Sequence, residues 1–147
     1  MVFFHALNFL LVPKTYVLDE RSKTGIKWQD QEHEELMNIL NLLVHGHKKN
    51  NKKMIQKSLS KLIDHAAHHF FDEEQVMFST NYPTREITKH LRNHHILWSK
   101  IQELELEGCS DKLIQDLHIW INDHISIYDR KLANHLLDKS KQDKNVI

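Results

Sequence analysis

The sequence predicts an all-α protein, an up-down-up-down four-helix bundle with an N-terminal arm. Four long stretches repeat apolar residues every three or four positions, and short polar breakers separate them. Residues that form turns are too few for an all-β fold, since the 147 residues include only three glycines and two prolines. Short loops make consecutive helices antiparallel neighbours, which is the arrangement of such a bundle.

The first two predicted helices occupy the first half of the domain. One begins near Asp30, a residue type that favours the N-cap, and runs to about Lys49. The Asn50-Asn51 pair interrupts it, and the second runs from about Lys52 to Phe78. Their apolar stripes are Leu36, Ile39, Leu40 and Leu43 in the first helix, and Ile55, Leu59, Leu62 and Ala66 in the second.

The third and fourth helices follow a Tyr-Pro turn. Thr84 is the expected N-cap of the third helix, which runs to about Glu107, and Gly108 is expected to end it. The fourth starts at Ser110 or Asp111 and runs to about Asp138.

The expected organisation is one domain with two extensions: an arm over residues 1–23, the bundle over 24–138 and a charged, frayed tail over 139–147. The apolar stretch Val2–Val12 lacks the basic start and the cleavage site of a signal peptide. We therefore expect it to pack on the domain.

Composition argues against several functional classes. Lys+Arg and Asp+Glu both number 20, and a formal net charge of zero argues against a nucleic-acid or membrane-surface binder. The single Cys109 excludes a disulfide framework and a cysteine-based metal site. No stretch reaches the roughly 18 apolar residues of a spanning helix, so we expect a cytoplasmic protein.

Histidine is the unusual residue, with 13 copies. Five of them continue the apolar stripes of the four helices: His33, His69, His90, His94 and His124. One such histidine would be an ordinary core residue, but five buried imidazoles are costly unless they are hydrogen-bonded or bound to metal. Since imidazole is the commonest protein metal ligand, the pattern predicts a metal site inside the bundle.

Spacing pairs some of these ligands and leaves others open. Two pairs lie four residues apart and so point the same way: His69 with Glu73, and His90 with His94. His65 could instead pair with His69, and His95 competes with His94 but breaks the four-residue spacing. In the fourth helix Asp129 follows His124 by five residues, which diverge by roughly 140° in an α-helix. A shared site there would require a π-type bulge, and spacing alone does not select Asp129.

Five segments of the chain together resemble a known family. They are TGIKWQDQEHEEL (24–36), HFFDEEQVM (69–77), YP (82–83), HLRNH (90–94) and WINDHISIYDR (120–130). In this order, over roughly residues 24–137, they resemble the hemerythrin family, and its single-domain bacterial members most. The resemblance implies an oxo- or hydroxo-bridged centre of two iron ions, whose ligands fall on His33, His69, Glu73, His90, His94, His124 and Asp129.

The ligand count predicts one open coordination position. By resemblance, the histidines divide into His90, His94 and His124 on one iron and His33 and His69 on the other. If Glu73 and Asp129 each bridge the irons and solvent supplies a third bridge, the three-histidine iron has six ligands. The two-histidine iron has five, which leaves a position for a small diatomic molecule. We expect this position to be walled by residues that also pack the core: Leu36, Phe70, Trp120, Ile121 and Ile125.

The leading hypothesis is reversible O2 binding, for storage, delivery or sensing, by a protein that is not an enzyme. The alternative is a di-iron enzyme acting on peroxide or nitric oxide, or an iron-handling protein. The sequence contains no Glu-x-x-His motif of the ferritin-like oxidases, which favours the carrier. Structural zinc explains the histidines but not two bridging carboxylates. The sequence leaves the oligomeric state open.

Overall fold

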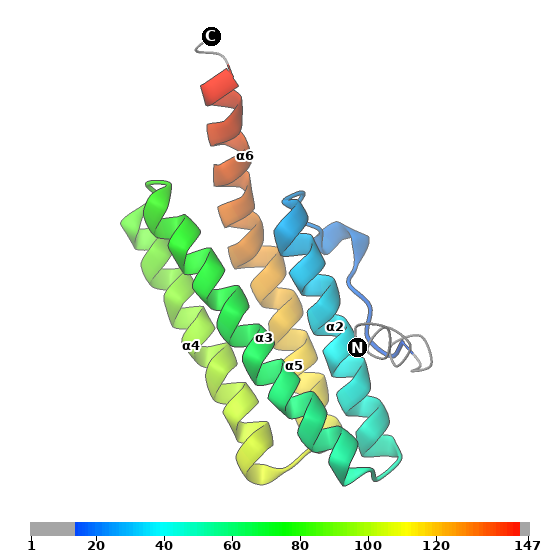
Figure 1. Ribbon diagram of the computed structural model, residues 1–147. Helices are drawn as coiled ribbons and strands as arrows, with labels where there is room; N and C mark the ends of the chain where they lie inside the picture. Colours follow the sequence, from blue (N-terminus) through cyan, green and yellow to red (C-terminus); the bar gives the residue numbers. More distant parts are fainter. Residues whose placement is uncertain (1–13, 145–147) are drawn as a thin grey trace, which may run out of the picture.

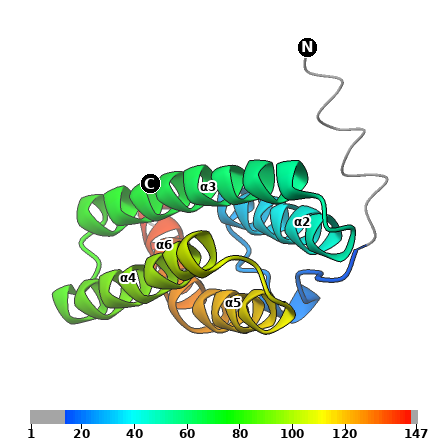
Figure 2. The ribbon, with the colours of Figure 1, turned by 90° about the horizontal axis from the view of Figure 1, so that it is seen from below.

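The computed structural model describes residues 14–144 and confirms an all-α bundle. The long helices are α2 (Lys27–Lys48), α3 (Lys52–Ser79), α4 (Thr84–Glu107), α5 (Asp111–His124) and α6 (Arg130–Lys144). Figure 1 shows α2 running down, α3 up, α4 down, and α5 with α6 up again, and Figure 2 shows them around a common core. Two short elements complete the described chain, the 3-10 turn η1 (Glu20–Ser22) and the π-helical turn η2 (Ile125–Asp129).

The start of α2 differs from the prediction. The helix begins at Lys27, so Asp30 is not its N-cap. The Asp30 carboxylate instead accepts hydrogen bonds from the backbone N–H groups of Thr24 (2.7 Å) and Gly25 (3.1 Å). Asp30 therefore holds the segment before the helix against the first turn of α2. An acidic residue inside the first turn can accept backbone hydrogen bonds in this way, as an N-cap residue does.

Three other helix ends are marked by a side-chain cap or by glycine, as predicted. The Asn51 side chain accepts from the Met54 N–H at 3.0 Å and the Ser110 side chain from the Leu113 N–H at 3.1 Å, so both are N-caps. Gly108 ends α4 with φ of 85°, as predicted. Thr84, however, is the first helical residue of α4 rather than its cap, and Pro83 precedes it.

The C-terminal end of the chain is more helical than predicted. The last predicted helix is three elements, because the π-helical turn separates α5 from α6. Helix α6 continues through Lys144, which corrects the expectation of a frayed tail from Lys139. Figure 1 shows α6 extending beyond the ends of its neighbours.

The core lies along the bundle axis between the helices. Its fully buried side chains include Leu40, Leu43, Leu62, Leu104 and Leu117, one or more from each of α2 to α5. Leu40, Leu43 and Leu62 are members of the predicted stripes. Removing such apolar surface from water is the main favourable term that holds the helices together.

The described part of the arm packs against the bundle. Asn41 of α2 exchanges two 2.8 Å hydrogen bonds with the backbone of Tyr16, whose ring stacks on His118 at a centroid distance of 4.0 Å. Leu18 is buried in the core. The stretch Val2–Val12 lies outside the described residues. Within residues 14–144, no helix is both long and apolar enough to cross a membrane.

Candidate metal centre

All seven side chains that the sequence singled out meet at one buried point of the bundle. Each residue is at most 4% exposed, and they come from four of the five long helices and from the π-helical turn: His33 (α2), His69 and Glu73 (α3), His90 and His94 (α4), His124 (α5) and Asp129 (η2). Because i and i+4 positions share a helix face, α3 and α4 each direct two of these side chains inward.

The seven side chains form two overlapping groups. One group holds Glu73, His90, His94, His124 and Asp129, and the other holds His33, His69, Glu73 and Asp129. Within each group, one nitrogen or oxygen atom per residue lies within 4.8 Å of all the others. The two carboxylates belong to both groups, so a cation in either group would contact both acidic side chains.

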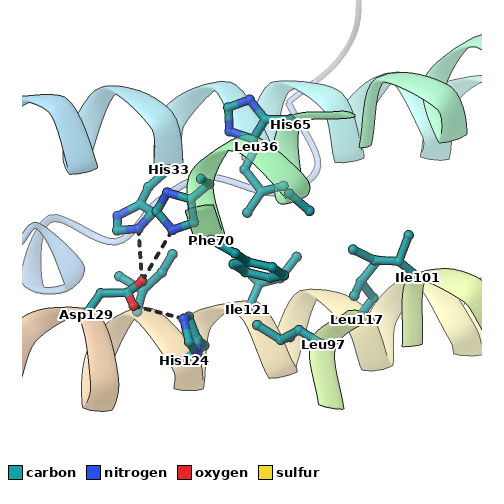
Figure 3. Close-up of a pocket in the computed structure, with 13 residues that line it drawn as sticks. His33, Leu36, His65, Phe70, Leu97, Ile101, Leu117, Ile121, His124 and Asp129 are labelled. Carbon is teal, nitrogen blue, oxygen red and sulfur yellow. Dashed lines mark ion pairs between the residues drawn. The ribbon is translucent and has the colours of Figure 1, made fainter. Parts of the chain in front are cut away.

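Asp129 faces the two groups with different oxygens. Its Oδ2 lies 3.0 Å from His33 Nε2, while its Oδ1 lies 2.8 Å from His124 Nε2 and 3.0 Å from His90 Nε2. Figure 3 shows the carboxylate between His33 and His124. A carboxylate so placed can offer one oxygen to each of two neighbouring cations.

Asp129 reaches this position because of the π-helical turn. In a regular α-helix, residues 124 and 129 diverge by about 140°. The π-helical turn spans Ile125–Asp129 and takes up one extra residue in the turn. The bulge that the five-residue spacing required is therefore present.

The groups strongly perturb one another's protonation. Burial, the largest influence, raises the pKa of Glu73 and of Asp129, but the surrounding histidines outweigh it and lower both pKa values below their usual range. Burial lowers the pKa of His90, but Asp129 and Glu73 outweigh it and raise that pKa to about 9. The carboxylates of the cluster are thus charged and draw protons onto neighbouring histidines, and a bound cation would take the place of those protons.

Several buried polar atoms of the cluster have no hydrogen-bond partner among the described residues. They are both ring nitrogens of His33 and of His90, His124 Nε2, and both carboxylate oxygens of Asp129. Buried polar atoms are normally satisfied, and leaving one unpaired costs about 1–3 kcal/mol. The Nε2 atoms of His33, His90 and His124 lie 2.8–3.0 Å from the Asp129 oxygens but form no hydrogen bond with them. Nitrogen and oxygen atoms that converge in this way fit a metal site, because cations would satisfy them.

Three of the histidines are oriented by neighbours that sequence reasoning missed. His69 Nδ1 donates to Glu32 Oε2 (2.7 Å), and His94 Nδ1 donates to Glu74 Oε1 (3.2 Å). His124 Nδ1 donates to Asn93 Oδ1 at 2.5 Å. Donation from Nδ1 leaves the Nε2 lone pair for a metal. Each orienting residue is adjacent in sequence to a member of the cluster, which is the signal that could have found it.

The competing histidines lie outside the cluster. His65 Nε2 pairs with the backbone oxygen of Glu32 at 2.8 Å, and His95 is exposed while His94 is buried. The four-residue pairs His69/Glu73 and His90/His94 are the ones that converge.

A small cavity adjoins the cluster. Its volume is about 20 Å³, which is enough for one very small molecule. Four predicted wall residues line it, namely Leu36, Phe70, Ile121 and Ile125. Figure 3 labels the first three of them beside the cavity. Trp120 does not line this cavity but is partly buried against the core. Sequence reasoning missed the wall residues Ala66, Leu97, Ile101 and Leu117, whose pattern is that of ordinary core residues.

Comparison with known proteins agrees with the geometry. The family description "Hemerythrin HHE cation binding domain" matches residues 24–136. The chain is 26% identical over 117 residues to a protein named bacteriohemerythrin from Stenotrophomonas maltophilia (strain R551-3), covering 76% of this chain and 75% of the relative. No solved structure matches the chain significantly. With a family match over most of its length and a buried cluster of histidines and carboxylates that fits a metal site, the chain belongs to the hemerythrin family.

Proposed function

We propose that this chain binds two iron ions with its seven clustered side chains and uses them to bind O2 reversibly. The observation that carries the proposal is the pair of overlapping ligand groups that share Glu73 and Asp129. Five imidazoles, which are neutral when they bind a metal, and two carboxylates suit a borderline metal such as iron better than a hard, oxygen-preferring cation such as Mg²⁺ or Ca²⁺.

The cavity supports the expected position of the open site. Both histidines of the two-histidine group, His33 and His69, line the cavity. Of the three-histidine group only His124 does, while His90 and His94 are not part of the wall. Both histidines of the group with fewer ligands therefore face free space, against one of three in the other group.

The wall of the cavity suits a small apolar molecule. Apart from His65 and the cluster members, its side chains are aliphatic or aromatic: Leu36, Ala66, Phe70, Leu97, Ile101, Leu117, Ile121 and Ile125. The Phe70 ring also stacks on His94 at a centroid distance of 4.1 Å, which holds both side chains in place. Such a wall admits O2, slows the entry of water and anions, and keeps the metal environment dry.

Iron, when bound, would supply the electrons that hold O2 and would take them back on its release. The chain's own part is to hold the ligands and exclude water. A peroxide- or nitric-oxide-reducing enzyme would also need protons delivered to the cavity. The non-ligand histidine in the wall, His65, has its Nε2 against the Glu32 carbonyl oxygen, which favours a binding role over an enzymatic one.

The test is anaerobic reconstitution with Fe²⁺ followed by optical spectroscopy. We expect two irons per chain and a spectrum that changes when O2 is added and reverts when O2 is removed. One metal per chain at saturation would contradict the di-iron assignment. Turnover of peroxide or nitric oxide far faster than autoxidation would instead favour the enzyme.

A further inference from the structure

Gln29 makes a buried contact with the cluster that the proposed function has not used. It lies in the first turn of α2, one turn before His33, and its side chain is fully buried. Its Nε2 donates a 2.7 Å hydrogen bond to Glu73 Oε1. A buried glutamine is uncommon, and this one spans from α2 to α3.

The chemistry of the pair fixes the orientation of the amide. An ionised carboxylate can only accept hydrogen bonds, so the amide must present its NH2 group to Glu73. The Gln29 carbonyl oxygen is then buried without a hydrogen-bond partner among the described residues. Leaving that oxygen unpaired is costly, and the bond from the other half of the amide to a charged group offsets part of the cost.

The same bond fixes the orientation of the Glu73 carboxylate, with one oxygen on Gln29 and the other toward the histidines. Oε1 is held by Gln29, while Oε2 lies 3.1 Å from His94 Nε2 and 3.2 Å from His90 Nε2. Any tilt of the carboxylate plane about its last bond would lengthen the contact with Gln29 as well as the contacts with the histidines.

We propose that Gln29 is a positioning residue for Glu73, and that its amide fixes the shared carboxylate in the orientation that serves both metal ions. This inference rests on the proposed function, since it takes Glu73 as a ligand common to both sites. It assigns to Gln29 a role different from that of the three residues that orient histidines. Asn93, for example, holds only His124 and so acts on the three-histidine site alone.

The test is a Co²⁺ titration of the metal-free full-length chain, followed by the visible absorption of the bound ion. We expect the unmodified chain to bind two Co²⁺ ions. Gln29→Met keeps the length of the side chain but removes the donor, and should weaken both binding events by about 10–100-fold. Asn93→Leu should weaken only one, and the Co²⁺ absorption bands should change accordingly.

Asn41→Leu is the matched control. Asn41 is also a buried amide of α2 with two hydrogen bonds, but it pairs with the backbone of Tyr16 away from the cluster. Its loss should lower thermal stability and leave both Co²⁺ affinities unchanged. Circular dichroism of each metal-free variant establishes its fold before titration, and Gln29→Asn, whose amide is one methylene too short, replaces Gln29→Met if that variant does not fold.

The outcomes separate the two proposals. If the unmodified chain binds fewer than two Co²⁺ ions, the proposed function fails. If it binds two and a folded Gln29 variant binds both with unchanged affinity and spectrum, or weakens at one site only, the positioning role alone is overturned.

Discussion

Glu73 and Asp129 are the residues on which both halves of the cluster depend. Each is fully buried and each belongs to both ligand groups, whereas every histidine belongs to one. The loss of a shared carboxylate would therefore remove a side chain from both groups and leave the surrounding imidazoles without that anionic partner.

We expect Glu73→Ala and Asp129→Ala to lose both metal ions, while His33→Ala loses or weakens one. The measurement is metal content per chain after equilibrium dialysis at a fixed free Fe²⁺ concentration. Asp123→Ala, which removes an exposed acid next to His124, is the control and should keep full loading. Full loading of Asp129→Ala would show that Asp129 is not a ligand.

A second prediction concerns the cavity wall. Ile125 is 1% exposed and lines the cavity, so Ile125→Ala should cost about 2–5 kcal/mol of unfolding free energy. It should also admit water and anions and shorten the lifetime of the O2-dependent spectrum, at unchanged iron content.

The matched control for this wall variant is Ile127→Ala in the same turn. Ile127 is 58% exposed and is not part of the wall. Equal lifetimes of the O2-dependent spectrum in the two variants would refute the role of Ile125.

At this scale the sequence predicts side chains whose spacing shows their direction, and misses those that act through contacts across helices. The pairs His69/Glu73 and His90/His94 follow from helical periodicity. Gln29 reads as one polar residue among several near a helix start, and only the packing of α2 on α3 shows that it reaches Glu73.

Among the elements, the π-helical turn is the one that deviates from regular geometry. It accommodates five residues where an α-helix would place four, with His124 before it and Asp129 at its end. In an α-helix, residues four apart point in nearly the same direction. A chain shortened by one residue within this turn would therefore still direct both side chains inward.

We accordingly expect deletion of Ile127 to preserve the fold and metal loading. Deletion of Asp72, also exposed, should abolish loading because it leaves Glu73 three residues after His69 and rotates it by about 100°. Metal content and helical circular dichroism of both variants are the measurements. Loss of metal in the Ile127 deletion with the helices intact would show that the bulge itself is needed.

Element boundaries were predictable where a cap or glycine marks them and less so elsewhere. Asn51, Gly108 and Ser110 end or start helices as the sequence indicates. The predicted start of the first helix at Asp30 was wrong, because an acidic side chain can accept backbone hydrogen bonds from within the first turn as well as from the cap position. The prediction for the tail after Asp138 was wrong because polar residues such as lysine and glutamine are good helix formers even without a buried face.

For the whole molecule, the cluster joins α2, α3, α4 and α5 through side chains from His33 to Asp129. The proposed metal sites therefore require these four helices to be packed together. Ions that bind the folded chain and not the unfolded one stabilise the fold by mass action.

We expect metal loading to raise the unfolding free energy by about 2.7 kcal/mol per site when free metal exceeds its Kd by 100-fold. The measurement is urea unfolding of metal-free and loaded protein at controlled free Fe²⁺. The slope with urea should stay the same, because the same surface is exposed in both cases. Coincident midpoints would mean that the ions do not bind the native state preferentially.

The residues beside the ligands also encode the hand of the bundle. Glu32 precedes a cluster residue, Glu74 follows one and Asn93 precedes one, and each contacts the next helix along the chain. Helices α2, α3 and α4 alternate in direction (Figure 1). One residue back in α2 or α4 and one residue forward in α3 are therefore rotations of about 100° in the same sense around the bundle. Arg130, which follows Asp129, continues the series by bonding to the backbone that leads into α2. The same helices wound the other way would turn these four side chains away from their partners. Apolar stripes alone do not distinguish the two mirror-image windings, so the neighbours of the ligands select between them.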